Sequence, residues 1–95
     1  MVTDVAVLAG GRSPEHEVSL ASSAQVLEHL DRRRWRVWPV YLDRDGGWWP
    51  AHSPLPAGGS LRLHDPSWSI GRQRPGGALD WLIDQARVQV VLPVL

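Results

Sequence analysis

Five consecutive small apolar residues, Val5–Ala9, are followed at once by two glycines and then by an amphipathic pattern. A continuous apolar run of this kind is typical of a strand that helices cover on both faces. Gly10 and Gly11 permit a tight turn with positive φ, so we expect the strand to end there. These features predict the opening strand and helix of an open α/β sheet, in which ligands bind outside the carboxyl ends of the strands.

The segment after the glycines predicts a helix. Pro14 suits the first helical position, and Ser13 before it is an acceptable N-cap. We expect the helix to run from about 14–18 to 30 or 31, with Ser19 as a rival cap. Apolar residues at helical spacing predict one buried stripe, formed by Leu20, Ala24, Leu27 and Leu30 with Val26 beside them.

A second strand is predicted for residues 35–42, parallel to the first and reached by a right-handed crossover. Asp43–Gly47 is a hairpin turn signal, and Trp48–Trp49 is the expected return strand. Residues 50–77 are rich in Pro, Gly and Ser, which predicts an irregular excursion with a short strand near 60–63.

The last third of the chain predicts a short helix over 78–86, with Leu79, Leu82 and Ile83 facing the sheet. Residues 88–95 predict another buried parallel strand. The fold class that we expect is therefore α/β, with a doubly wound, mainly parallel, Rossmann-like sheet.

Composition excludes several classes of function. The ten basic and ten acidic residues cancel, so no global field favours nucleic acid or a membrane, and no cysteine is available for a disulfide or a thiolate. The first apolar run is too short for a signal peptide or a membrane span, which predicts a soluble cytoplasmic protein. The arginine-rich stretch 32–36 falls at a helix C-terminus, where cations suit the dipole. The six tryptophans predict core packing and a hairpin that covers a sheet edge.

The four histidines show no metal-ligand spacing, and we expect all of them on the surface or in loops: His16, His29, His52 and His64. The Gly10–Ser13 stretch also lacks the spacing of a dinucleotide fingerprint or a P-loop.

Glu15 is the strongest candidate for chemistry. A carboxylate in the first helical turn gains about 0.3–1 kcal/mol from the helix dipole, which favours its ionised form and suits it to a cationic group such as an ammonium. The residues alone leave open that it only stabilises the helix, because acidic residues are common in first turns. Glu17 lies about 200° further round the helix and supports the loop or the cap. Ser13 is expected to cap the helix or to steady the loop. Val18 could belong to the hydrophobic core or line a binding site.

The stretch GGRSPEHEVSL at residues 10–20 resembles the D-alanine–D-alanine ligases, whose N-terminal domain begins with a strand followed by GG-x-S-x-E-x-E-V-S. The resemblance implies a domain that precedes an ATP-grasp fold, and the ATP-dependent joining of two D-alanines for peptidoglycan synthesis. In that family ATP phosphorylates the first D-alanine, the amine of the second attacks the acyl phosphate, and Mg²⁺ or Mn²⁺ neutralises the phosphates. Glu15 matches the glutamate that contacts the amino group of the first D-alanine, and is the expected catalytic residue. Val18 matches the apolar residue beside the substrate methyl group, and with Ser13 completes the expected substrate-binding set.

The resemblance also implies what this chain lacks. Residues 91–95 resemble those just before an HG-x-x-GED-G motif, so we expect residues 1–95 to be a truncated N-terminal domain, inert alone. ATP and metal would be bound by regions outside it, and the full enzyme would be a homodimer. The second substrate could be D-alanine, D-lactate or D-serine. The alternatives are another ATP-grasp ligase, or a non-catalytic α/β ligand-binding or interaction module that ends at Leu95, and the following residues of the gene distinguish them.

Overall fold

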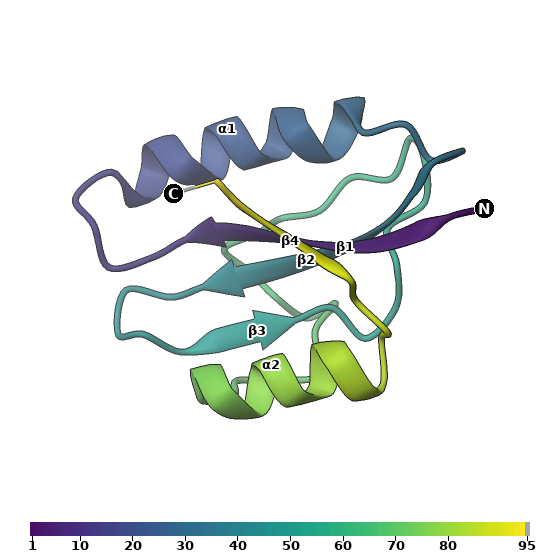
Figure 1. Ribbon diagram of the computed structural model, residues 1–95. Coiled ribbons are helices and arrows are strands. Elements are labelled where there is room, and N and C mark those ends of the chain that lie inside the picture. Colours follow the sequence, from purple (N-terminus) through teal and green to yellow (C-terminus); the bar gives the residue numbers. More distant parts are fainter. Residues whose placement is uncertain (95) are drawn as a thin grey trace.

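The computed structural model describes residues 1–94, which form one sheet with a helix on each face (Figure 1). The strands are β1 (Thr3–Gly10), β2 (Trp35–Leu42), β3 (Trp48–Pro50) and β4 (Val90–Val94), and the helices are α1 (His16–His29) and α2 (Pro75–Asp84). The order in the sheet is β3-β2-β1-β4, with β1, β2 and β4 parallel and β3 antiparallel. The expected fold class and hairpin are therefore confirmed. Leu95, the end of the predicted last strand, lies outside the described residues.

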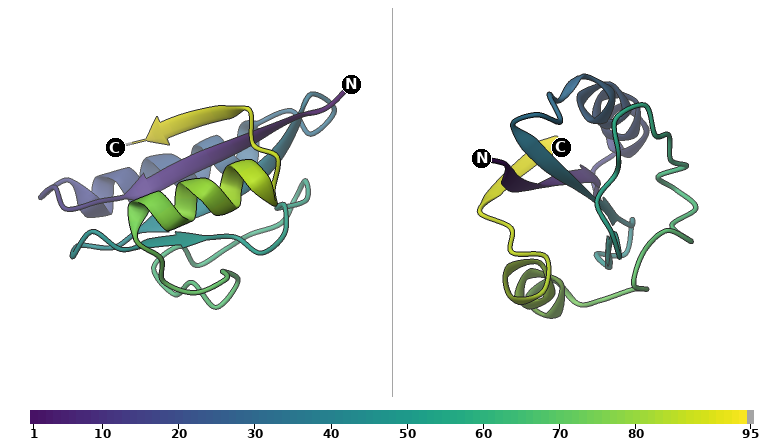
Figure 2. Two further views of the ribbon diagram at one scale, coloured as in Figure 1. Left: turned by 60° about the horizontal axis from the view of Figure 1, so that its bottom comes forward. Right: turned by 90° about the vertical axis from the view of Figure 1, so that its right-hand side faces the viewer.

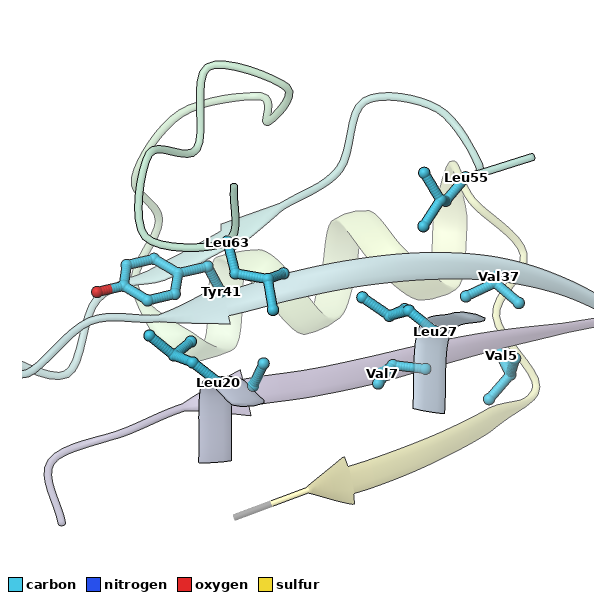
Figure 3. Close-up of a cluster of buried hydrophobic side chains, with 9 residues drawn as sticks. Val5, Val7, Leu20, Leu27, Val37, Tyr41, Leu55 and Leu63 are labelled. Carbon is cyan, nitrogen blue, oxygen red and sulfur yellow. The ribbon is translucent and has the colours of Figure 1, made fainter. Parts of the chain in front are cut away.

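The central strands are buried on both faces because their side chains alternate between two cores. The core on the α1 side contains Val5, Val7, Ala9, Leu20, Leu27, Val37, Tyr41, Leu55 and Leu63 (Figure 3). The core on the α2 side contains Ala6, Leu8, Trp38, Val40, Leu42, Leu82 and Ala86. This two-sided burial is the reason that β1 reads as a continuous apolar run instead of an alternating one.

The buried face of α1 is partly polar. The predicted stripe is confirmed at its leucines, but Ala24 is exposed and Ser23, one residue earlier, is fully buried. His16 and Ser19 continue this buried line toward the start of the helix. Their spacing is as helical as that of the leucines, and both find hydrogen-bond partners in neighbouring elements, so both can be buried.

Both α2 and β4 bury less apolar surface than the sequence predicts. Ala78 and Leu82 of α2 face the sheet, whereas Leu79 and Ile83, which were also predicted to face it, are 36% and 57% exposed. Only one face of this short helix meets the sheet. Leu79 and Ile83 each follow a buried residue directly, so their side chains point about 100° away from that face. The predicted buried strand at the C-terminal end is instead an edge strand with β1 as its described neighbour, which leaves residues 90–92 exposed.

Residues 51–74 form the irregular excursion that was predicted for 50–77, because β3 ends at Pro50 and α2 already begins at Pro75. Figure 2 shows this segment arching from β3 to α2, on the side of the sheet away from β4. The short strand predicted near 60–63 is not formed in the structure. Three isolated bridges hold the segment instead, and they pair Leu55 with Val37, Gln73 with Trp48, and Ala51 with Ser69. Leu63 is buried in the α1-side core. Backbone hydrogen bonds to β2 and β3 and the burial of Leu55 and Leu63 therefore hold the segment together.

The six tryptophans all pack against one of the two cores, as predicted. Trp38 is the most deeply buried and meets Trp81 of α2 edge to face, with ring centroids 5.9 Å apart.

Within residues 1–94, no helix is both long enough and apolar enough to cross a membrane.

Candidate functional site

The candidate site lies at the carboxyl edge of the sheet, where β1 turns into α1. Gly10 and Gly11 both adopt positive φ, 100° and 106°. A side chain at Gly10 would collide with the main-chain carbonyl of Leu42 in β2, so the turn requires a glycine at this position. The Gly11 N–H donates to the same carbonyl at 2.8 Å. The loop that leads to Glu15 is thus held against the end of β2.

Glu15 is the N-cap residue of α1 and is exposed. The helix therefore begins at His16, within the predicted range of 14–18, and neither Ser13 nor Ser19 is its N-cap. Within the described residues the Glu15 carboxylate makes no ion pair and no side-chain hydrogen bond. It stands at the positive end of the helix dipole with its own negative charge open to a ligand.

A hollow of about 400 Å³ lies beside Glu15, between the first turns of α1 and the end of β4. Its lining residues are Glu15, Val18, Ser19, Ser22, Pro93 and Val94. Val18 is 58% exposed and so has no role in the core. The structure therefore brings Glu15 and Val18 to one concave surface, and adds two residues of β4 that the sequence did not single out.

Ser13 lies outside this hollow. The sequence predicted that the Ser13 side chain caps α1, but the N-cap residue is Glu15. The Ser13 Oγ instead accepts a hydrogen bond from the Glu15 N–H at 3.0 Å, within the loop. Ser13 therefore steadies the loop, which is the other role considered for it. Glu17 has a different partner, because its carboxylate forms an exposed ion pair at 3.2 Å with Arg44 in the β2–β3 turn.

His16 is buried, with 2% of its surface exposed, and this corrects the prediction that all four histidines lie on the surface. His29, His52 and His64 are exposed as predicted. The His16 Nδ1 lies 2.6 Å from the carbonyl oxygen of Gly11, and its Nε2 lies 3.1 Å from the hydroxyl of Tyr41. Its position at helical spacing from Leu20 was the available signal, which a search for metal-ligand spacing missed.

Ser19 joins three elements under the hollow. Its Oγ accepts a hydrogen bond from the Gly10 N–H at 2.9 Å and donates one to the carbonyl oxygen of Val94. The hydroxyl thereby links the end of β1, the first turn of α1 and the end of β4. A serine is suited to this position because its hydroxyl donates and accepts at the same time.

Asp43, directly after β2, organises the neighbouring hairpin turn. Its carboxylate accepts hydrogen bonds from the N–H groups of Asp45 and Gly47, from the Trp49 indole and from Arg72, at 2.8–2.9 Å. Burial alone would raise the pKa of Asp43, but the hydrogen bonds from Arg72, Trp49 and the two amides together lower the pKa well below its usual range. Asp43 therefore serves the turn as a charged acceptor and is not free to bind a ligand.

This arrangement predicts an acid-sensitive hairpin. Because the pKa of Asp43 is lower in the folded chain than in the unfolded chain, its stabilising effect is complete above the unfolded value. We expect the effect to be lost as the pH falls from about 5 toward 2. Melting curves over this range should show a smaller loss of stability in Asp43→Asn than in the wild type. Parallel pH dependences of the two proteins would contradict the assignment.

The described residues bring together no group of three or more His, Asp or Glu side chains that could hold a metal ion. The polar side chains that line the candidate site are one carboxylate, of Glu15, and two hydroxyls, of Ser19 and Ser22, and this set suits an ammonium group better than Mg²⁺. We therefore assign no metal ligand among residues 1–94.

Comparison with known proteins identifies the family. Residues 4–95 match the family model described as "D-ala D-ala ligase N-terminus". The chain belongs to the D-alanine–D-alanine ligase family. The resemblance to this family predicted from residues 10–20 is thus confirmed, and the alternative of an unrelated interaction module is disfavoured.

Curated relatives agree with this assignment. The chain is 61% identical over 44 residues to D-alanine–D-alanine ligase A of Bradyrhizobium diazoefficiens, a match that covers 46% of this chain. It is 41% identical over 83 residues to the D-alanine–D-alanine ligase of Nocardia farcinica, covering 87% of this chain. These matches span 12% and 22% of the relatives' own lengths. The chain thus corresponds to the N-terminal part of these ligases.

Two solved ligases share the fold. The VanG D-Ala:D-Ser ligase from Enterococcus faecalis matches with a TM-score of 0.52 and 32% identity, over 56% of this chain and 16% of that one. The D-alanine–D-alanine ligase from Coxiella burnetii matches over 93% of this chain and 34% of that one, with a TM-score of 0.52 and 21% identity. The second likeness concerns the fold alone.

Proposed function

We propose that this chain is the N-terminal substrate-binding domain of an ATP-dependent D-alanine–D-alanine ligase, and that Glu15 binds the ammonium group of the first D-alanine. The observation that carries the proposal is the exposed Glu15 carboxylate, which faces a hollow at the carboxyl edge of a parallel sheet. Sites in open α/β sheets lie at this edge. The assignment of the chain to the ligase family supports the substrate.

Each residue of the site has a distinct part in this proposal. The Glu15 carboxylate holds the ammonium by a charge-assisted hydrogen bond and so orients the substrate, which is a positioning effect and no proton transfer. The exposed Val18 side chain supplies apolar contact for the D-alanine methyl group. Ser13 holds the Glu15 amide and thereby the loop. Peptidoglycan synthesis in the cytoplasm is the corresponding cellular role.

A chimeric enzyme tests this function directly. The chain replaces the matching N-terminal segment of the Nocardia farcinica ligase, to which it is 41% identical over 83 residues. We expect the chimera to form D-alanyl-D-alanine from ATP and D-alanine, and to support growth of a bacterium that lacks its own ligase. A folded but inactive chimera would overturn the proposal.

ATP supplies the phosphoryl group that activates the first D-alanine, and we place its site outside these residues. Titration calorimetry of the chain with ATP and Mg²⁺ should therefore give no heat of binding at micromolar concentrations. A micromolar ATP site on the chain itself would contradict the domain assignment. The homodimer and the identity of the second substrate follow from the resemblance alone and stay predictions.

A further inference from the structure

His16 is the first residue of α1 and is buried, whereas residues 11–15 of the loop before it are at least partly exposed. We propose that His16 is a positioning residue for Glu15, and that it acts through the hydrogen bond from its Nδ1 to the Gly11 carbonyl. This inference rests on the proposed function, because it concerns where the ligase carboxylate is held. It adds a residue that does not itself touch the substrate.

The geometry assigns a role to each ring nitrogen of His16. A carbonyl oxygen only accepts hydrogen bonds, so the contact of 2.6 Å with Gly11 requires a proton on Nδ1. Nε2 lies 3.1 Å from the Tyr41 hydroxyl, and the two rings meet at 86° with centroids 5.6 Å apart. Figure 3 shows the Tyr41 hydroxyl pointing away from the aliphatic side chains of the core. The imidazole is therefore fixed at both nitrogens.

The loop depends on such an anchor. Gly10 and Gly11 at its start have the greatest backbone freedom of any residue type, so they permit the turn without enforcing it. The Nδ1 bond closes the loop from His16 back to Gly11, and the His16 N–H adds a bond of 3.0 Å to the carbonyl of Ser13. The Glu15 carboxylate, with no partner of its own among the described residues, is placed by this backbone alone.

The chemistry of the side chain provides a matched pair of variants. An asparagine side chain can place its amide nitrogen near the position of Nδ1, whereas the longer glutamine places its nitrogen near the position of Nε2. Both are polar amides, so they differ mainly in which of the two hydrogen bonds they keep. Tyr41→Phe removes the Nε2 partner and leaves the Nδ1 bond in place.

The test uses the chimeric ligase with His16→Gln, His16→Asn and Tyr41→Phe, and measures KM for the first D-alanine, KM for ATP and kcat. We expect His16→Gln to raise the D-alanine KM about five- to ten-fold, the worth of roughly one net hydrogen bond. The ATP KM and kcat should change little. His16→Asn and Tyr41→Phe should keep the D-alanine KM near that of the wild type.

A merely structural histidine would give a different pattern, because a smaller folded fraction lowers the apparent kcat and leaves the D-alanine KM unchanged. An active wild-type chimera in which His16→Gln keeps its D-alanine KM, or in which His16→Asn is no better, overturns this inference alone. An inactive wild-type chimera overturns the proposed function and this inference with it. Nitrogen NMR of the chain gives a readout independent of activity, and an unprotonated Nδ1 on His16 would also overturn the inference.

Discussion

In the chimeric ligase, Glu15→Gln is expected to lower kcat/KM for D-alanine about ten- to a hundred-fold. Glutamine keeps the shape of the side chain but removes the charge that pairs with the substrate ammonium. A hydrogen bond to a charged group contributes about 1.5–3 kcal/mol, and each step of about 1.4 kcal/mol is a factor of ten. The ATP KM should stay nearly unchanged, since the nucleotide is bound elsewhere.

Glu17→Gln is the matched control for this prediction. Glu17 lies two residues further on in the same helical turn, and its partner is Arg44 on the surface. We expect the control to keep a D-alanine kcat/KM within about twofold of the wild type. If Glu15 only stabilised the helix, Glu15→Gln would lower the melting temperature slightly and leave the D-alanine kinetics intact. Steady-state kinetics with a melting curve beside them separate the two outcomes.

The second large effect is on stability. Ser19→Ala removes the hydroxyl that joins the Gly10 N–H to the Val94 carbonyl, and leaves both groups without that partner. An unsatisfied buried group costs about 1–3 kcal/mol. With a shift of about 4–8 °C for each kcal/mol in a domain of this size, the melting temperature should fall by about 10 °C. Differential scanning calorimetry of the chain measures this shift.

Ser23→Ala is the internal control, one helical turn along the same buried face. The Ser23 hydroxyl is fully buried and has no hydrogen-bond partner within the described residues, so its removal should leave stability unchanged or slightly raise it. Both substitutions bring the same gain in helix propensity, so the difference between them reports the hydrogen bonds. Equal shifts in the two variants would show that the Ser19 link contributes nothing to stability.

Local pattern alone was enough to predict the class of fold and the location of Glu15. The run of five apolar residues followed by two glycines predicted a short buried strand and a turn, and β1 forms there. The second strand, β2, begins and ends at the residues that its pattern predicted. The position of Glu15 at the start of the helix follows from the same reading, because start signals are read from adjacent residues. The family motif then suggested a ligand for it.

Burial depended on partners that are distant in the sequence. Ser23 is buried where Ala24 was predicted, and Ile83 is exposed, because the orientation of each helix is set by the whole sheet that it covers. The last strand is apolar in sequence, yet its residues 90–92 are exposed because within the described residues β1 is its only neighbour in the sheet. Periodicity defines a stripe on a helix or strand but does not say which neighbour will cover it.

The buried residues near Glu15, His16 and Ser19, show most clearly what the sequence pattern could not predict. His16 and Ser19 are polar residues whose types alone favour the surface. They are buried because Tyr41, 25 residues from His16, and Val94, 75 residues from Ser19, bring hydrogen-bonding groups to them in the fold. A buried polar group is tolerated only when such a partner is present, and short-range sequence pattern contains no information about a partner so far along the chain. The sequence pattern therefore located the Glu15 carboxylate. Long-range packing determined the groups that hold the loop beneath it, which are His16 and Ser19 with their partners.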